Sequence, residues 1–287
     1  STPEGSAESI ASPGSAGARS TPEGSAESIA SPGSAGARST PEGSAESIDP
    51  GALVSAEVAR TLASCPVVDV IARPPVQGMS RLLGDAIAWR YLARRATPLA
   101  PSSERALVIG NVEPPAALEL PSLATWSTTG ELLSGPAATP SRALAAIATA
   151  GEVTIHAHGV VDVALPDASF LALSPEADGR FALTTGDVRK ARFATSPLII
   201  LAACRASSAA LVWHDTWSLP AAFVLAGARA VIASTAAIPD AEAATFFDAV
   251  RSEVRGGASV AVALRDVRQK WLADHRGDWV RDVIVFE

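Results

Sequence analysis

The segment that most constrains the fold is residues 197–208, PLIILAACRASS, because an apolar run there stops abruptly at a polar loop. Residues 198–202 contain no charge, which is typical of a strand that is buried on both faces of a parallel sheet. A strand of this kind needs helices on both sides of its sheet, so this one segment predicts an α/β fold. Cys204 and Arg205 follow at the point where the strand ends.

A second strand, predicted at residues 153–159, VTIHAHG, ends in the same manner at His158 and Gly159. The carboxyl ends of parallel strands face the crevice in which α/β proteins bind their ligands. The two strands are therefore expected to bring a thiol and an imidazole to one rim of the sheet. A cysteine nucleophile needs a neighbouring base of this kind, so Cys204 and His158 form the candidate catalytic pair.

The remaining patterns alternate between strands and helices, an order that right-handed crossovers convert into a parallel sheet. We expect further strands at residues 66–72, 105–112, 169–174, 179–183, 227–234 and 278–286. We expect helices at residues 55–63, 81–95, 139–150, 187–191, 215–226, 239–255 and 259–272. Thr139 and Pro140 are the predicted cap and first residue of one helix.

Residues 1–48 form a tandem repeat: STPEGSAESIASPGSAGAR occurs at 1–19 and 20–38, and its first ten residues recur at 39–48. A period of this length suggests a solenoid. The unit has one isoleucine and no aromatic residue, however, so it cannot bury enough apolar surface to fold. We expect a disordered linker at 1–48 and one folded domain at 49–287. Because the chain begins with serine, we also expect it to be a fragment or a processed form.

Composition excludes several classes of function. The chain has 287 residues, 48% of them hydrophobic, which is enough for a large domain with a two-sided core. Its net charge of −7 gives no basic footprint for nucleic acid or for a membrane surface. Two cysteines, Cys65 and Cys204, are too few for a disulfide framework and favour a cytoplasmic location. No apolar stretch of about 18 residues predicts a membrane span.

The order of these motifs resembles the CHAT domain family of caspase-like peptidases, which are bacterial relatives of caspases and separases. The resemblance extends from Arg105 to Phe286. It is carried by residues 155–159 (IHAHG), 201–204 (LAAC), 222–229 (AFVLAGAR) and 231–234 (VIAS), followed by Asp240. Two segments depart from the family pattern. Arg205-Ala206-Ser207 replaces the usual Glu-Thr-Gly after the cysteine, and residues 235–240 replace Leu-Trp-Pro-Val-Asp-Asp; these departures concern substrate preference and regulation more than chemistry.

The resemblance implies a caspase-like three-layer sandwich with a mostly parallel central sheet and helices on both faces. It also implies a cysteine endopeptidase in which Cys204 is the nucleophile and His158 the acid–base. The backbone N–H groups of Gly159 and Cys204 would form the oxyanion hole. No metal or other cofactor is expected. The expected partners are a protein substrate and an upstream sensor or helical-repeat module, in bacterial defence or another form of regulated proteolysis.

Two other functions remain open. The first is a catalytically silent CHAT-like domain that serves as an interaction module. The second is a metal-dependent hydrolase using His156 and His158, whose rings would lie on one side of a strand. That metal site lacks further ligands, since only Asp162, His214 and His275 are left to supply them. We therefore interpret His156 as a buried residue of the core or a residue that supports the site.

Three further side chains have two interpretations each. Trp213 and Trp217 flank the loop after Cys204, where they either line a substrate groove or take part in ordinary packing. Asp240 either caps the helix that begins there or faces a lysine or arginine side chain of the substrate. For Asp240 we expect the helix cap.

Overall fold

A computed structural model describes residues 49–73, 76–93, 101–128, 130–160, 169–204, 210–212 and 215–287. The chain divides into two units, Ser1–Ser47 and Ile48–Glu287. The predicted linker at 1–48 lies outside the described residues, and the boundary at residue 49 stays a prediction.

An eight-stranded sheet forms the centre of the second unit, in the order β1-β2-β13-β12-β9-β5-β3-β4. All neighbouring strands of this sheet are parallel except β12 and β13, which are antiparallel. The mostly parallel sheet predicted from the sequence is thereby confirmed. The strands are β1 (Val68–Val70), β2 (Trp89–Tyr91), β3 (Ala106–Ile109), β4 (Glu131–Leu133), β5 (Glu152–His156), β9 (Leu198–Ala202), β12 (Ala230–Ser234) and β13 (Val283–Phe286).

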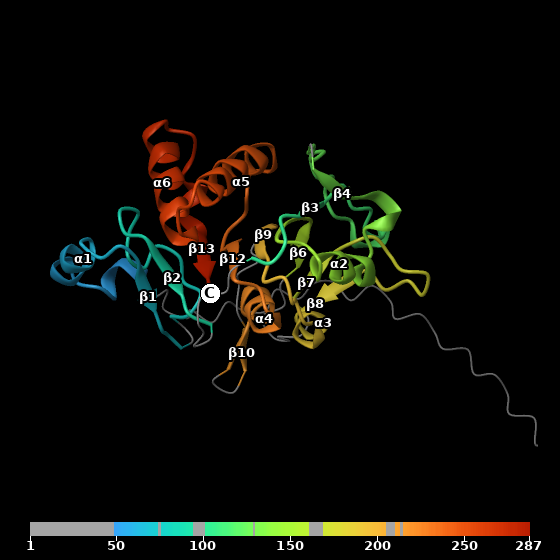
Figure 1. The fold of residues 1–287 in the computed structure, drawn as a ribbon, viewed down its shortest axis with the longest axis horizontal. Helices are drawn as coiled ribbons and strands as arrows, with labels where there is room; N and C mark the ends of the chain where they lie inside the picture. The colour runs from blue at the N-terminus through green and yellow to red at the C-terminus, as the bar shows by residue number, and fades with distance from the viewer. Residues whose placement is uncertain are drawn as a thin grey trace, which may run out of the picture. The chain divides into compact units, whose positions relative to one another are not determined.

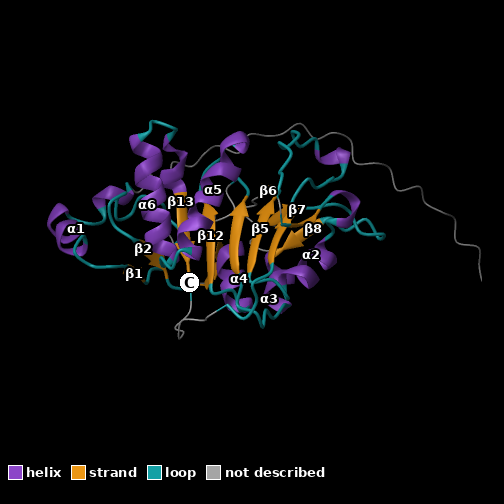
Figure 2. Cartoon of the chain, turned by 45° about the horizontal axis from the view of Figure 1, so that its top comes forward, coloured by secondary structure: helices purple, strands orange, loops and turns teal. Residues whose placement is uncertain are grey.

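Helices cover both faces of this sheet. Alternate side chains of its central strands therefore belong to two separate cores. In β9, all five residues are buried. Ile199 and Leu201 belong to the core that contains residues of α2 (Pro140–Ile147), α3 (Thr185–Lys190) and α4 (Leu219–Ala226). Leu198, Ile200 and Ala202 belong to the core that contains residues of α5 (Asp240–Arg255) and α6 (Val260–Ala273). The result is the expected three-layer sandwich (Figure 1, Figure 2).

Smaller elements surround the central sheet. An antiparallel three-stranded sheet contains β6 (His158–Val160), β7 (Phe170–Ala172) and β8 (Ala182–Thr184). A hairpin pairs β10 (Ala210–Val212) with β11 (Asp215–Trp217). The short helix α1 (Ala56–Leu62) and the 3₁₀ turns Pro50–Ala52, Ala116–Leu118, Gly135–Ala137 and Asp278–Asp282 complete the described elements.

The helix predicted at residues 81–95 is wrong, because this segment supplies β2 instead. Arg81 and Gly84 have φ angles of 62° and 76°, which lie in the left-handed region and are incompatible with an α-helix. Tyr91 is fully buried, and its ring stacks on that of Phe286 in β13 at a centroid distance of 5.5 Å. Packing against β13 therefore outweighs the helical pattern of the sequence.

Three other predicted elements are divided in the structure. In the strand expected at 278–286, the 3₁₀ turn Asp278–Asp282 precedes β13, which begins only at Val283. The helix expected at 215–226 begins only at Leu219, where the Ser218 hydroxyl accepts the N–H of Ala221, and β11 precedes it. The strand expected at 153–159 ends at His156, and His158 begins β6 in a different sheet. The predicted roles of Asp162, Trp213 and His214 concern residues outside the described part of the chain, and the side chain of Trp217 also lies outside it.

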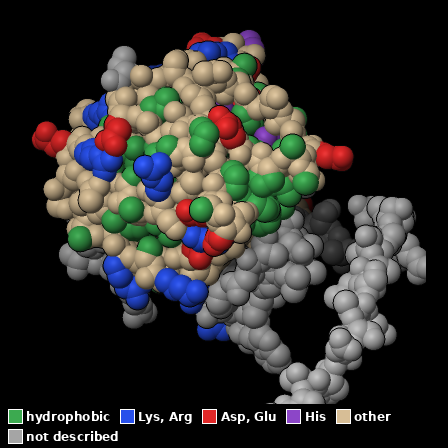
Figure 3. Space-filling view, turned by 90° about the vertical axis from the view of Figure 1, so that its right-hand side faces the viewer, with side chains coloured by type: hydrophobic (Ala, Val, Ile, Leu, Met, Phe, Trp, Pro, Cys, Tyr) green, Lys and Arg blue, Asp and Glu red, His purple; other side chains and the backbone are tan. Residues whose placement is uncertain are grey.

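No helix among the described residues is both long and apolar enough to cross a membrane. On the face of the molecule shown in Figure 3, the described Lys and Arg side chains are interspersed with Asp and Glu side chains. This face therefore presents no extended basic patch in its described part, in keeping with the acidic net charge of −7.

Candidate active site

The two predicted strand ends lie at one rim of the central sheet. β5 and β9 are parallel neighbours, and their register places His156 opposite Ala202. The chain then continues from β9 through Ala203 to Cys204, and from β5 through Ala157 to His158. The register of β5 and β9 thus brings the segments that carry His158 and Cys204 to the same rim of the sheet.

Gly159 and Cys204 are in direct backbone contact. A Cβ atom added at Gly159 would lie 2.3 Å from the carbonyl oxygen of Cys204, a separation that real Cβ atoms do not reach. Only glycine fits at this position without displacing the backbone that holds the thiol. The His158-Gly159 segment is thus packed against the residue proposed as the nucleophile.

The Cys204 thiol is partly buried and interacts with the segment that follows β12. The N–H of Ile238 donates to Sγ at 3.4 Å, and the thiol donates to the Ile238 carbonyl oxygen at 4.0 Å. The backbone of Ile238 thus holds the sulfur in place through both its N–H and its carbonyl group. This contact involves only the backbone of Ile238, so no feature of the sequence could have indicated it.

The His158 imidazole is oriented by a backbone carbonyl. Its Nε2 lies 2.7 Å from the oxygen of Pro121, in the connection between β3 and β4. A carbonyl oxygen can only accept, so Nε2 donates and carries a proton. Nδ1 is then the nitrogen that can exchange a proton with the substrate or the thiol. In this structure, the described side chains of His158 and Cys204 form their hydrogen bonds with these separate backbone partners.

His156 is a buried residue that supports the rim, in line with its interpretation from the sequence. Its side chain is 2% exposed, and Nε2 is hydrogen-bonded to the carboxylate of Asp240. The ring packs against Trp126 at a centroid distance of 4.7 Å. Its Nδ1 is buried without a hydrogen-bond partner among the described residues.

Asp240 is not the cap of α5, which corrects the expectation from the sequence. Pro239 occupies the cap position, and Asp240 is the first residue of the helix. One carboxylate oxygen of Asp240 bonds His156, and the other accepts the N–H of Ala124. The Asp240 side chain is 30% exposed, and its hydrogen bonds join it to His156 and Ala124.

The geometry does not favour the metal-site alternative. The Nε2 atoms of His156 and His158 are directed at different partners, Asp240 and the Pro121 carbonyl. Across the described ranges, no group of three or more His, Cys, Asp and Glu side chains is arranged to hold a metal ion. His275, the other described histidine, has a φ of 54° and follows the end of α6.

Comparison with protein families matches the CHAT domain to residues 53–283. No match was found among the curated proteins. Among solved structures, the Arg-specific cysteine proteinase gingipain R is 16% identical, with a TM-score of 0.42 over 67% of this chain. The chain spans 48% of the length of gingipain R.

Two further solved structures are similar to the chain. The complex of the RgpB pro- and mature domains from Porphyromonas gingivalis is 13% identical, with a TM-score of 0.49, and the match covers 82% of this chain and 69% of that chain. The separase–securin complex of Saccharomyces cerevisiae is 10% identical, with a TM-score of 0.44, and the match covers 71% of this chain and 14% of that chain.

Proposed function

Because the chain belongs to the CHAT domain family, we propose that it is a caspase-like cysteine endopeptidase with Cys204 as nucleophile and His158 as general acid–base. The observation that carries this proposal is the backbone contact between Gly159 and Cys204. Through this contact, the segment that carries the His158 imidazole lies against the segment that carries the Cys204 thiol, where β5 and β9 end. The carboxyl-terminal rim of a parallel sheet is also where α/β proteins bind ligands.

The proposed reaction has two steps. Nδ1 of His158 first takes the proton of the Cys204 thiol. The resulting thiolate attacks the carbonyl carbon of the peptide bond, and the N–H groups of Gly159 and Cys204 stabilise the negative charge on the carbonyl oxygen. His158 gives a proton to the amine as the C–N bond breaks, which leaves a thioester on Cys204. Water then attacks the thioester, His158 accepts the proton from that water, and the thiolate is released with a carboxylic acid product.

The bond from His158 Nε2 to the Pro121 carbonyl supports this assignment of roles. It fixes the tautomer and the plane of the ring, and it leaves Nδ1 available for proton transfer. The N–H of Ile238 in turn positions the sulfur of Cys204. Both proposed catalytic side chains thus have a backbone partner that fixes their position.

A direct test compares the wild-type chain with Cys204→Ala and His158→Ala on a proteome-derived peptide mixture, with new termini identified by mass spectrometry. We expect both variants to lose cleavage by about a thousandfold or more, because each removes a member of the reacting pair. Iodoacetamide should abolish activity and a chelator should leave it unchanged. Cleavage by Cys204→Ala at the wild-type rate would refute the proposal, and inhibition by a chelator with rescue by zinc would support the His156 and His158 metal site.

The second candidate function is the catalytically silent interaction module. It is favoured by one observation, the separate hydrogen-bond partners of His158 and Cys204. A thiol-reactive peptide probe distinguishes the two functions, because Cys65 provides an internal comparison. A peptidase should be labelled at Cys204 well ahead of Cys65, whereas a silent module should show no such preference.

The proposed partners are a specific protein substrate and an upstream sensor or helical-repeat module. The resemblance to the CHAT family supports both, in bacterial defence or another regulated proteolysis in the cytoplasm. The repeat at 1–48 has the composition of a linker that would join such a module to the peptidase. A peptidase regulated in this manner would cleave few generic peptides on its own, and for that reason the thiol probe is paired with the cleavage assay.

A further inference from the structure

Two backbone segments contact the candidate catalytic side chains, and neither belongs to a strand. The Pro121 carbonyl accepts from His158 at 2.7 Å, and the Ile238 N–H donates to Cys204 at 3.4 Å. The first segment lies in the connection between β3 and β4, and the second lies between β12 and α5. Something other than the ladder of the sheet must therefore fix the position of each segment.

Asp240 connects these two segments. It lies two residues after Ile238, so a displacement of Asp240 also displaces the backbone that carries the Ile238 N–H. One of its carboxylate oxygens accepts the N–H of Ala124, three residues after Pro121. A single carboxylate thus bridges the segment that contacts the thiol and the segment that contacts the imidazole.

His156 fixes this carboxylate relative to the sheet. It is the last residue of β5, its side chain is 2% exposed, and its Nε2 bonds the second oxygen of Asp240. Trp126 packs on the other side of the bridge, with its ring 4.7 Å from that of His156. Asn111 holds the Trp126 backbone through two hydrogen bonds of 2.8 and 3.1 Å. Buried polar groups that are bonded in this manner have little freedom to move.

We propose that Asp240, held by His156, is a positioning residue that sets the Pro121 carbonyl and the Ile238 N–H at the distances required by His158 and Cys204. Its role in catalysis rests on the proposed function. Its effect on the reactivity of the Cys204 thiol does not, because the Ile238 contact is a property of the folded chain. The two effects can therefore be measured separately.

The first measurement is the rate at which iodoacetamide alkylates Cys204 in the full chain at neutral pH, followed by peptide mass spectrometry. We expect Asp240→Ala to slow this reaction about tenfold, the effect of losing one hydrogen bond to a charged group. Alkylation of Cys65 in the same sample should not change. Asp240→Asn should have an intermediate rate, because its amide oxygen can replace only one of the two carboxylate acceptors.

The second measurement is the cleavage of a peptide substrate. A displacement of the catalytic pair lowers kcat, whereas a lost substrate contact raises KM. We expect Asp240→Ala to lower kcat by about tenfold to a hundredfold with little change in KM, as misplacement by a fraction of an ångström does. His156→Gln keeps a donor for Asp240, so it should retain more activity than His156→Leu.

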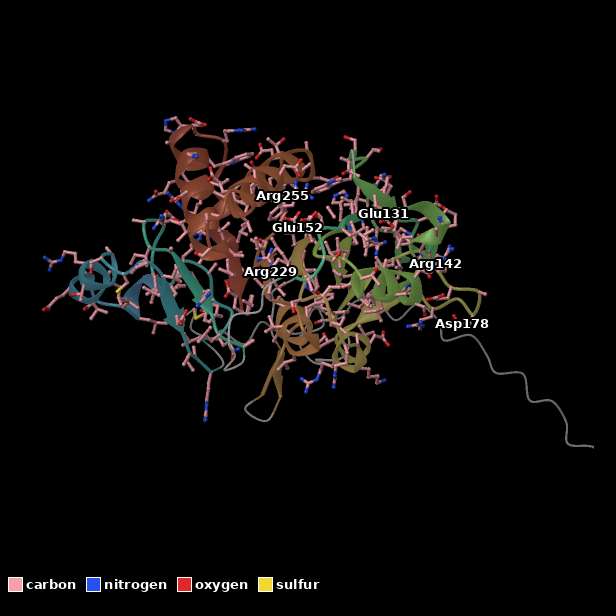
Figure 4. The ribbon with its side chains drawn as sticks, viewed as in Figure 1. Glu131, Arg142, Glu152, Asp178, Arg229 and Arg255 are labelled. Carbon is pink, nitrogen blue, oxygen red and sulfur yellow. The ribbon has the colours of Figure 1, made fainter. Side chains whose placement is uncertain are left out.

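A matched control exists at the opposite end of the same two elements. Glu152, the first residue of β5, pairs with Arg255, the last residue of α5 (Figure 4). Arg255→Ala therefore removes a link between α5 and β5 without touching the candidate rim. We expect it to leave the alkylation of Cys204 and kcat unchanged, even where its thermal midpoint falls as much as that of Asp240→Ala.

Two outcomes would overturn the proposal. One is an Asp240→Ala variant in which both the alkylation rate of Cys204 and kcat equal those of the wild type. The other is an equal loss in Asp240→Ala and Arg255→Ala, which would reduce Asp240 to an anchor for α5. If Asp240→Ala does not fold, Asp240→Asn decides by the same criteria. A failure of the proposed function itself differs from both, because either the wild-type chain would then cleave no peptide or Cys204→Ala would keep the cleavage activity, while the alkylation result still stands.

Discussion

Position 159 requires a glycine because the backbone of Cys204 lies against it. The added Cβ of an alanine here would lie 2.3 Å from the Cys204 carbonyl oxygen and 3.7 Å from the Ala203 Cβ. Because the first of these atoms is backbone, relief requires a shift of the chain that carries the thiol.

We predict that Gly159→Ala lowers the free energy of unfolding by about 1 to 3 kcal/mol, as forced overpacking does. It should also lower the rate of peptide cleavage about a hundredfold, since the displaced backbone belongs to the proposed nucleophile. Denaturant unfolding and initial rates measure the two effects. Gly130→Ala is the control, because its nearest neighbours lie 3.4 and 3.6 Å from the added atom, an ordinary contact distance. Equal behaviour of the two variants would contradict the prediction.

At the scale of elements, α2 begins with a cap that the sequence did not reveal. Thr139 occupies the predicted cap position but makes no side-chain capping bond. The N–H of Ser141 donates instead to Glu176, at 2.7 Å, from the connection between β7 and β8. This bond from the Ser141 backbone holds the pKa of Glu176 below its usual value. The hairpin that carries Glu176 thus stabilises a helix that is distant in the sequence.

The stability that Glu176 contributes should depend on pH in one direction. Its pKa is lower in the folded than in the unfolded state, so the contribution is complete above the usual value of 4.5 and is lost as the pH falls through the folded value. We predict that Glu176→Ala lowers the free energy of unfolding by about 1 kcal/mol at neutral pH, the usual effect of a lost cap.

Denaturant unfolding at neutral and acidic pH tests this prediction. The difference between wild type and Glu176→Ala should shrink in acid. Glu253→Ala is the comparison, because the pair of Glu253 with Lys270 is exposed and surface ion pairs contribute little. A Glu176→Ala deficit that is the same at both pH values would show that the charge of this side chain has no part in the cap.

For the whole molecule, the chain divides between Ser47 and Ile48. The repeat that precedes this point has no aromatic residue and few apolar side chains to bury. We predict that a chain consisting of residues 48–287 has the same thermal midpoint as the full chain, within about 1 °C. Calorimetry of the two proteins measures this, and a fall of several degrees would show that the repeat contributes to the stability of the fold.

The sequence by itself determined the class of the fold, and it led to a proposal for the place of the candidate site. The apolar run Leu198–Ala202 is typical of a strand buried on both faces, and the structure buries all five of its residues. The order of the family motifs agrees with the match to the CHAT domain. The ends of the apolar run and of residues 153–159 pointed to Cys204 and His158. The register of β5 and β9 agrees with that expectation, and the roles of the two residues remain a proposal.

Only the tertiary structure decided which residues support this rim. His156 and Asp240 are 84 positions apart in the sequence. They meet because β5 ends, and α5 begins, at the same edge of the sheet. Pro121 and Ile238 act through backbone groups, which every residue has and no pattern distinguishes. Likewise Trp89–Tyr91 became a strand through packing against β13. A strand that is buried on both faces can be predicted from its local composition. Contacts between distant segments depend on the crossovers and the register of the sheet, which the local sequence does not encode.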